Sequence, residues 1–358
     1  MRKTILLAIV VGVGVGWGAW SIARERARQR LLVEFQELYN GGDLGVLIQK
    51  AEERLETHPE DIDALIAAAN AYSMKGSVGF SEGPHGNKAV EYADRVLALE
   101  PQHSEAHRIK GYAFEIQERY GDAIKEYDLA IVSNPQNYQA LSNKGHAYDL
   151  QGNLVEAERW YIQSIHENPN GEHALMNIAR LYARQAKMAE AKASLEKLTA
   201  SSSNARLKAE GFQMLAEIYR SEMNYKDAKS SIDQSIRFDP SVPQAWVTRG
   251  QIAIMGMLQD PTATQEQMAA EVRLCADKAL AIHPTQASAF ALLFDLAGAL
   301  GKEDERQSFK RQALDVIDRD ITLGQGERAA LRDYLNAQVT VTSVSETGVV
   351  QTETPPSP

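Results

Sequence analysis

A period of 34 residues is the feature of this sequence that most constrains how it can fold. Two stretches, one beginning at Ser104 and the other at Tyr138, align along their whole length at this spacing. In both, small residues recur at the eighth, twentieth and twenty-seventh places, large apolar or aromatic residues at the eleventh and twenty-fourth, and proline at the thirty-second: Gly111, Gly145, Ala123, Ala157, Ala130, Ser164, Phe114, Tyr148, Tyr127, Tyr161, Pro135 and Pro169. A period of this length indicates one small unit stacked repeatedly on itself.

Each unit is predicted to be a pair of antiparallel α-helices. Small residues at the eighth and twentieth places let the two helices touch, and the bulky residues fill the groove beside that contact. The proline cannot donate the hydrogen bond that would continue the second helix, so it ends the unit. Since one hairpin cannot cover its own apolar faces, neighbouring hairpins must stack. We therefore expect an all-α chain.

The pattern resembles the tetratricopeptide repeat (TPR), whose 34-residue hairpin it matches place by place. Further copies begin at Ile62, Glu172, Ala209 and Pro243, and weaker ones at about Arg28 and Ala287. The resemblance implies a right-handed α-solenoid of about seven to eight hairpins. The N-terminal sequence adds one transmembrane helix before them. It also implies protein binding, without naming a partner.

The expected domain organisation has five parts. These are a transmembrane anchor with a short basic start (1–23), a basic juxtamembrane helix with a degenerate first repeat (24–61), the TPR array (62–320, with copies near 62, 104, 138, 172, 209, 243 and 287), a capping helix (321–338) and a disordered tail (339–358). The cap covers the last apolar face, whereas the tail cannot bury a core. Two insertions, a glycine-rich one at 74–88 and another within 256–267, are expected to form loops.

The N-terminus carries an uncharged run of twenty residues, Thr4 to Ala23. As a helix it spans about 30 Å, the thickness of a bilayer's hydrocarbon core. A cleaved signal peptide is the alternative, since small residues precede Arg24. The long apolar core and the following arginines favour a retained anchor. We therefore expect a single-pass membrane protein, and the resemblance to membrane-anchored bacterial TPR proteins implies a bacterial inner membrane. Basic residues flank both ends of the run, so the side on which the array lies stays open.

Several classes of function are not expected. The net charge is −10 and no basic stripe follows the first thirty residues, which argues against nucleic-acid binding. Cys275 is the single cysteine, so neither an intrachain disulfide nor a cysteine-based metal site is expected. His103 and His107 stand four residues apart but lack a third ligand. No nucleophile triad, zinc helix or dinucleotide motif is present. We expect no enzyme activity, no cofactor and no metal.

In TPR proteins the first helix of each hairpin lines a concave groove, with its second, fifth, sixth, ninth and twelfth places pointing in. Applied to this sequence, that rule gives a peptide-binding groove of Asn70, Arg108, Tyr112, Asn143, His146, Asn177, Arg180 and Gln213, with Glu115, Asp149 and Glu217 among them. In some family members an asparagine at the sixth place binds the backbone of an extended peptide, because an amide both donates and accepts. Asn143 and Asn177 hold that place in adjacent copies. The alternative is that asparagine is simply frequent there.

The sequence thus favours a non-enzymatic, membrane-anchored scaffold or adaptor. Its groove would recruit protein or peptide clients into the assembly or quality control of an envelope complex, with residues 4–23 in the lipid bilayer. Two alternatives stay open. One is a self-assembling homo-oligomer, for which the small-residue pairs Gly12/Gly16 and Gly14/Gly18 would bring anchors together. The other is a regulatory subunit of a membrane-associated enzyme.

Overall fold

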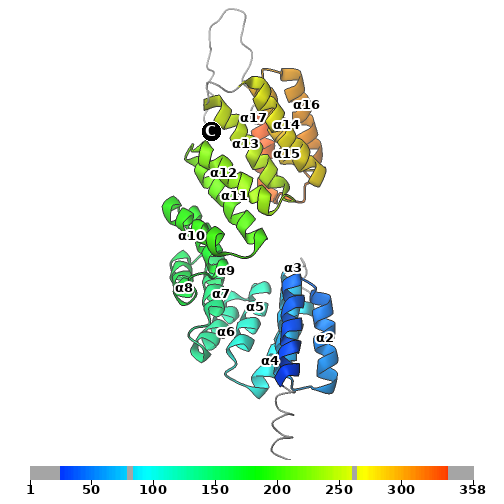
Figure 1. The fold of residues 1–358 in the computed structure, drawn as a ribbon, viewed down its shortest axis with the longest axis vertical. Helices are drawn as coiled ribbons and strands as arrows, with labels where there is room; N and C mark the ends of the chain where they lie inside the picture. The colour runs from blue at the N-terminus through cyan, green and yellow to red at the C-terminus, as the bar shows by residue number, and fades with distance from the viewer. Residues whose placement is uncertain (1–24, 79–83, 260–263, 338–358) are drawn as a thin grey trace, which may run out of the picture. The chain divides into compact units, whose positions relative to one another are not determined.

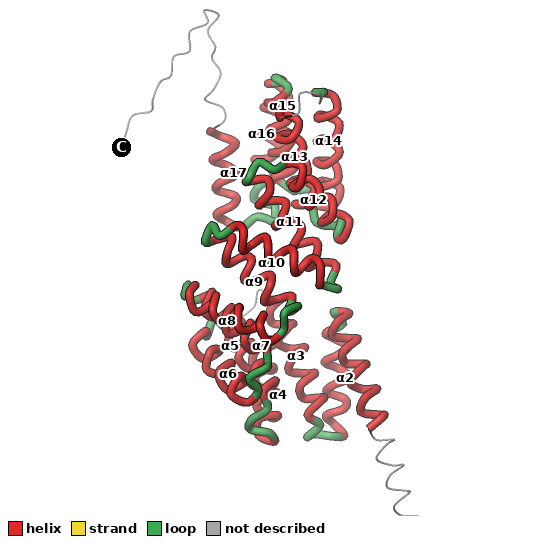
Figure 2. Tube along the Cα trace, turned by 60° about the vertical axis from the view of Figure 1, so that its left-hand side comes forward, coloured by secondary structure: helices red, strands yellow, loops and turns green. Residues whose placement is uncertain are grey.

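The computed structural model describes residues 25–78, 84–259 and 264–337, and within these ranges every regular element is a helix (Figures 1 and 2). The expected all-α fold is therefore confirmed for this part of the chain. Residues 25–41 are helical, and they are followed by α2 (Leu44–Thr57), α3 (Ile62–Val78), α4 (Pro84–Leu99), α5 (Ser104–Ile116), α6 (Tyr120–Ser133), α7 (Tyr138–Leu150), α8 (Leu154–Glu167), α9 (Glu172–Arg184), α10 (Met188–Ser201), α11 (Ala205–Ser221), α12 (Tyr225–Phe238), α13 (Pro243–Gln259), α14 (Gln265–Ile282), α15 (Ala287–Ala299), α16 (Glu303–Val316) and α17 (Gln325–Ala337).

The close contact between the two helices of a hairpin explains the glycine at the eighth place. A Cβ on Gly111 would lie 2.6 Å from the ring of Tyr127, and one on Gly145 would lie 2.8 Å from the ring of Tyr161. Each tyrosine is fully buried at the twenty-fourth place of its own copy. The helices therefore approach closely only because these positions carry no side chain.

The turn inside each hairpin repeats as well. Every residue with a positive φ in the described ranges occupies the fifteenth place of its copy: Gly42, Glu118, Gly152, Ala186, Met223 and Gly301. The backbone thus reproduces the 34-residue register, even where the residue is not glycine. Side chains other than glycine are strained in this left-handed conformation, typically by about 1 kcal/mol.

The two copies with insertions lack this turn, and the expected loops are largely helix. α3 runs through the fifteenth place to Val78, and α4 already begins at Pro84. In the same way α13 extends to Gln259, and α14 begins at Gln265. The extra residues therefore mostly lengthen the hairpins. Residues 79–83 and 260–263 lie outside the described part of the chain.

The chain divides into two compact units, Met1–Gln185 and Ala186–Pro358, which we call the N-terminal and C-terminal units. In both, helices pack mainly on their neighbours in sequence, and the first helices of adjacent hairpins also meet, as α3 meets α5 and α5 meets α7. This packing is that of a solenoid, in which each repeat contacts the next.

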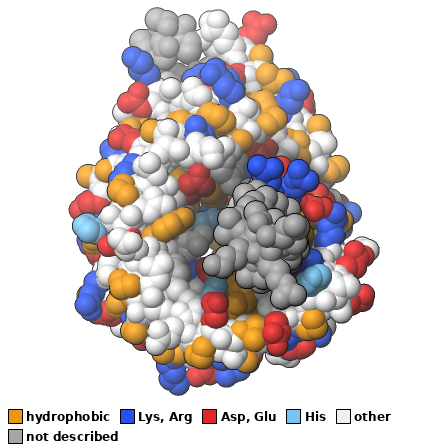
Figure 3. Space-filling model, turned by 60° about the horizontal axis from the view of Figure 1, so that its bottom comes forward, with side chains coloured by type: hydrophobic (Ala, Val, Ile, Leu, Met, Phe, Trp, Pro, Cys, Tyr) orange, Lys and Arg blue, Asp and Glu red, His pale blue; other side chains and the backbone are white. Residues whose placement is uncertain are grey.

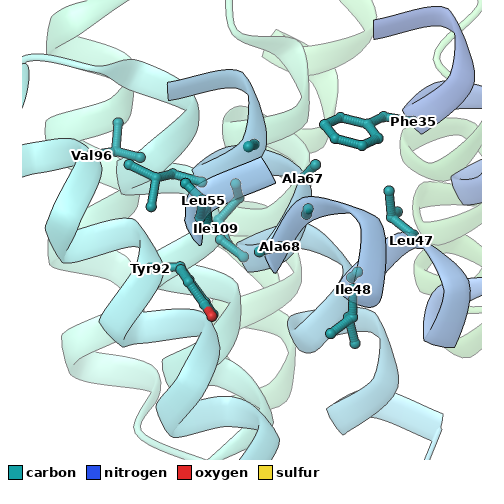
Figure 4. Packing of buried hydrophobic residues seen from close by; sticks show 14 of the residues in the cluster. Phe35, Leu47, Ile48, Leu55, Ala67, Ala68, Tyr92, Val96 and Ile109 are labelled. Carbon is teal, nitrogen blue, oxygen red and sulfur yellow. The ribbon is translucent and has the colours of Figure 1, made fainter. Parts of the chain in front are cut away.

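The core of the N-terminal unit begins with the helix at residues 25–41. Phe35 from that helix, Leu47 from α2, Ala67 from α3, Val96 from α4 and Ile109 from α5 belong to one apolar cluster (Figure 4). All five are buried. This end of the array is thus held by side chains from five consecutive helices.

In the C-terminal unit, α17 packs on the last hairpin. Leu335 is fully buried in a cluster with Phe294 of α15. Tyr334 meets Phe294 edge to face, with ring centroids 6.4 Å apart, and its hydroxyl donates to Asp295 Oδ1 at 2.5 Å. α17 therefore covers apolar surface that α15 and α16 leave.

The predicted anchor at residues 4–23 and the predicted tail at 339–358 lie outside the described residues. Among the helices that the structure does describe, none combines the length and the apolar character needed to cross a bilayer.

Candidate functional site

The predicted groove residues fall in both units. Gln213 lies on α11 of the C-terminal unit, where its amide donates to Glu217 Oε1 at 3.5 Å. The other seven lie on the first helices of consecutive hairpins in the N-terminal unit: Asn70 on α3, Arg108 and Tyr112 on α5, Asn143 and His146 on α7, and Asn177 and Arg180 on α9. We call the surface that these seven share the inner face.

Near α3 and α5 the polar groups of the inner face are engaged with one another. Arg108 Nη2 donates to Asn70 Oδ1 at 2.9 Å and to Glu105 Oε1 at 2.6 Å, while its Nε donates to Glu105 Oε2 at 2.8 Å. Salt bridges and hydrogen bonds of this kind fix an arginine's planar fork in one direction. Asn70 and Arg108 therefore link α3 to α5, and both the Asn70 side-chain oxygen and the Arg108 guanidinium are engaged.

Tyr39, which the sequence argument did not single out, belongs to this same region. Burial raises the pKa of its phenol, and the charges of Arg108 and Glu105 act on it together with Tyr112. Tyr39 occupies the twelfth place of the weak copy that begins at Arg28. The groove rule would have found it if that copy had been included.

Between α5 and α7 a buried carboxylate ties two repeats together. Glu115 is buried, and its Oε2 accepts a hydrogen bond from the hydroxyl of Tyr127 on α6 at 3.0 Å. Its other oxygen lies 2.8 Å from His146 Nδ1 on α7. The hydrogen bond from Glu115 raises the pKa of His146, which favours the imidazolium form. The second ring nitrogen of His146 has no partner among the described residues.

Between α7 and α9 the equivalent polar groups are arranged differently. Asp149, at the place of Glu115, forms an ion pair with Arg184 of α9. The hydroxyl of Tyr161 is buried and has no hydrogen-bond partner in the described residues. Asn143 and Asn177 are half-buried, and the side-chain amide of neither hydrogen-bonds to a described residue. The inner face therefore offers unengaged polar groups at α7 and α9 rather than at α3 and α5.

Arg184 was missed by the groove rule because it lies at the thirteenth place, one residue beyond the places that the rule covers. Arg180, which the rule did select, is exposed on α9, and its charge acts on His146. Tyr112 is half-buried on α5, and its phenol lies near enough to Tyr39 to influence that pKa.

The described residues contain no group of three His, Cys, Asp or Glu side chains that could hold a metal ion. His103 caps α5, with Nδ1 accepting from the backbone of Ala106 at 3.2 Å. His107 is buried, with Nδ1 2.7 Å from Glu126. Cys275 is also buried, which raises the pKa of its thiol.

Charge is mixed on the visible part of one face of the molecule. On the face seen in Figure 3, acidic and basic side chains alternate, and no large basic patch stands out. A nucleic-acid backbone is usually bound by a concentrated basic stripe. This face offers none.

Comparison with known proteins gives the same repeat. Residues 87–138, 117–172 and 172–204 match family models of the tetratricopeptide repeat. A search of curated proteins finds no match. These matches cover α4 to α10 and include the hairpins that carry the engaged and unengaged parts of the inner face.

Solved structures share the fold at low sequence identity. One is a chain of the APC/C hetero-tetramer Cut9–Hcn1, with 17% identity and a TM-score of 0.55 over 74% of this chain and 48% of that one. The chain thus spans about half of that relative. Another is a tetratricopeptide repeat protein from Parabacteroides merdae, with 16% identity and a TM-score of 0.51 over 77% of this chain and 98% of that one. A third is the C-terminal part of a TPR repeat-containing protein from Cytophaga hutchinsonii, with 12% identity and a TM-score of 0.53 over 74% and 98%.

At these identities the neighbours establish the fold alone, an all-α helical-repeat solenoid. Such a fold suggests a scaffold for protein–protein interaction. The 34-residue period, its recurrence in the backbone turns and the matches to the family models lead to one conclusion: this chain contains tetratricopeptide repeats.

Proposed function

We propose that the chain is a non-enzymatic scaffold that binds an extended segment of a client protein across the inner face of its N-terminal unit. One observation carries the proposal. Asn143 and Asn177, at the same place of adjacent repeats, present half-buried amides with no partner among the described residues. An amide can accept from a peptide N–H and donate to a peptide C=O, so two amides one repeat apart suit a peptide backbone.

The part of the inner face at α3 and α5 contrasts with the proposed client site at α7 and α9. Arg108 and Asn70 are already bonded to each other, whereas α7 and α9 contact each other and keep their amides available. Binding of a client at α7 and α9 would therefore break few hydrogen bonds within this chain.

The cellular setting that we propose follows from the N-terminus. The uncharged run at residues 4–23 would anchor the chain in the inner membrane of a bacterium as a single pass. The TPR array would then recruit clients close to the bilayer, in the assembly or quality control of an envelope complex. The length of the run and the arginines that follow it support an anchor that is retained.

The test uses the full chain, extracted from membranes in mild detergent, as bait for clients identified by mass spectrometry. The Asn143→Ala and Asn177→Ala double variant should retain clients about thirtyfold less, because it loses two hydrogen bonds that are worth about 1 kcal/mol each. Its melting temperature should not fall, since alanine favours helix. Asn170→Ala, in an exposed turn, is the matched control.

Equal retention by the double variant and the control would rule out the amide pair as the client site. Release of the chain from membranes by alkaline carbonate would separately rule out the anchor.

A further inference from the structure

Three arginines lie in the first two turns of the helix at residues 25–41, and the structure separates their roles. Arg28 is paired within the chain: its Nε donates to Asp63 Oδ2 at 2.5 Å, and its Nη2 donates to Asp63 Oδ1 at 3.0 Å. This two-point contact joins the helix to the start of α3. Arg26 and Arg30 are exposed, and neither forms an ion pair with any residue that the structure describes.

The packing of this helix fixes the side on which each arginine lies. Phe35 is buried in the apolar cluster of the N-terminal unit (Figure 4), and Arg28 stands two turns before it on the same side. Arg26 and Arg30 are four residues apart, so they share one face of the helix. That face is turned away from the cluster and includes Val33, which is 55% exposed.

Arg26 and Arg30 also line one shallow hollow of the surface, together with Glu25 and Gln29. The acid of this hollow is already engaged, because Glu25 Oε1 accepts a hydrogen bond from Gln29 Nε2 at 2.9 Å. Two guanidinium groups against one carboxylate leave the hollow with an excess of positive charge. Since a guanidinium can form two parallel hydrogen bonds with a phosphate, the hollow suits a phosphate group.

The place of the two arginines in the chain indicates where such a phosphate would come from. The uncharged run that we propose as the anchor ends at Ala23. A helical path rises 1.5 Å per residue, which would put Arg26 about 5 Å and Arg30 about 11 Å beyond the run. The headgroup layer on one side of a bilayer is about 5–8 Å thick, and a long arginine side chain can reach along it. Lipid phosphates are therefore within reach of both guanidinium groups.

We propose that Arg26 and Arg30 bind the phosphate of an anionic phospholipid, while Arg28 holds the same helix on the array. This proposal rests on the proposed membrane anchor. The chain as a whole has a net charge of −10, so an anionic bilayer surface repels most of it and attracts its basic end. The contact would hold the first hairpin at the bilayer and leave the acidic remainder of the array free of it.

The experiment measures lipid binding to the full chain in mild detergent, stripped of co-purified lipid, by native mass spectrometry. Phosphatidylglycerol, phosphatidylcholine and inorganic phosphate are titrated separately. The wild-type chain should bind phosphatidylglycerol most tightly. Phosphatidylcholine carries no net charge, and inorganic phosphate has no acyl chains to hold it beside the anchor.

The Arg26→Gln and Arg30→Gln double variant should bind phosphatidylglycerol about thirtyfold more weakly, the combined effect of two basic residues at an anionic headgroup. Its melting temperature should not change, because both side chains are exposed and glutamine suits a helix. Arg28→Gln removes a charge from the same turns and should leave the affinity nearly unchanged. Arg206→Gln with Arg311→Gln, two exposed arginines of the C-terminal unit, is the control with the same change in net charge.

Wild-type affinity for phosphatidylglycerol in the double variant would overturn the site. An equal loss in the distant control, or equal binding of all three probes by the wild-type chain, would overturn it as well. The anchor is tested apart from the site by alkaline carbonate. A chain that carbonate releases, but that still prefers phosphatidylglycerol through these arginines, would lack the anchor and keep the site as a peripheral contact. A chain that resists carbonate without this preference would keep the anchor and exclude the site.

Discussion

The hairpins α5/α6 and α7/α8 share one helix–helix contact, and at the twelfth place their acidic residues differ by one methylene group. Both pack a glycine against a buried tyrosine, Gly111 on Tyr127 and Gly145 on Tyr161. In the first, Glu115 reaches the tyrosine hydroxyl at 3.0 Å. In the second the acidic residue is Asp149, which forms its ion pair with Arg184 on α9. The shorter side chain leaves the second hydroxyl without an acceptor among the described residues. Glu115 bonds both to Tyr127 of its own repeat and to His146 of the next, whereas Asp149 pairs with Arg184 of the next.

This difference shows how a repeat protein separates its scaffold from its site. The places that set the helix–helix contact carry the same residues in both hairpins, glycine at the eighth and tyrosine at the twenty-fourth. The places on the inner face are free to vary, and small changes decide whether a polar group is engaged by the protein or available to a ligand. Three pairs of variants test how far the two hairpins are equivalent.

The largest effect is expected at the shared contact. Gly111→Leu and Gly145→Leu should each lower the free energy of unfolding by about 3 kcal/mol or more, because even a Cβ would lie within 3 Å of a tyrosine ring. Urea unfolding followed by circular dichroism measures both. Similar losses are expected in the two hairpins. A loss confined to one of them would show that the contacts are not equivalent.

Removal of the tyrosine hydroxyl should affect stability differently in the two hairpins. Tyr127→Phe leaves the buried Glu115 with one hydrogen bond fewer and should destabilise the chain by about 1–2 kcal/mol. Tyr161→Phe removes an unsatisfied hydroxyl, so it should be neutral or stabilising in the absence of ligand. Thermal unfolding of the two variants under one buffer condition gives the comparison. Equal destabilisation would mean that Tyr161 has an acceptor in solution.

The smallest effect on stability is expected in the turns. The two substitutions there should change the stability in opposite directions. Glu118 and Gly152 both have positive φ at the fifteenth place, 58° and 77°. Glu118→Gly relieves a strained conformation and should stabilise the chain by up to about 1 kcal/mol, whereas Gly152→Ala introduces that strain and should cost a similar amount. Shifts in melting temperature in opposite directions would confirm that the two turns are equivalent. Shifts in the same direction would contradict it.

Much of the fold could be predicted because the repeat is a local pattern. Gly111 and Tyr127 lie within one hairpin, so the spacing between them already describes their contact. The turn at the fifteenth place was less visible, since Glu118, Ala186 and Met223 hold a conformation that the sequence signals only where glycine is present. The prediction that the insertions form loops is largely wrong for a related reason. Without that turn the first helix continues, so α3 and α13 lengthen instead of giving way to loops.

For the candidate site, the sequence could predict only which residues lie on the inner face. The places in the repeat identified Asn143, Asn177 and His146, which lie on adjacent helices of the N-terminal unit. They could not show that Arg108 is engaged by Asn70, because that contact joins residues 38 apart in different repeats. Nor could they show which partner of an ion pair is buried, since exposure depends on how neighbouring helices stack.

Packing between neighbours in sequence also has a mechanical consequence. Within each unit the contacts between described residues join mainly neighbouring repeats, so a unit pulled at its two ends carries the load through one repeat after another. It should yield one hairpin at a time, and each hairpin of 34 residues would release about 110 Å of extended chain. The array would behave as an extensible tether whose length reports the load on it.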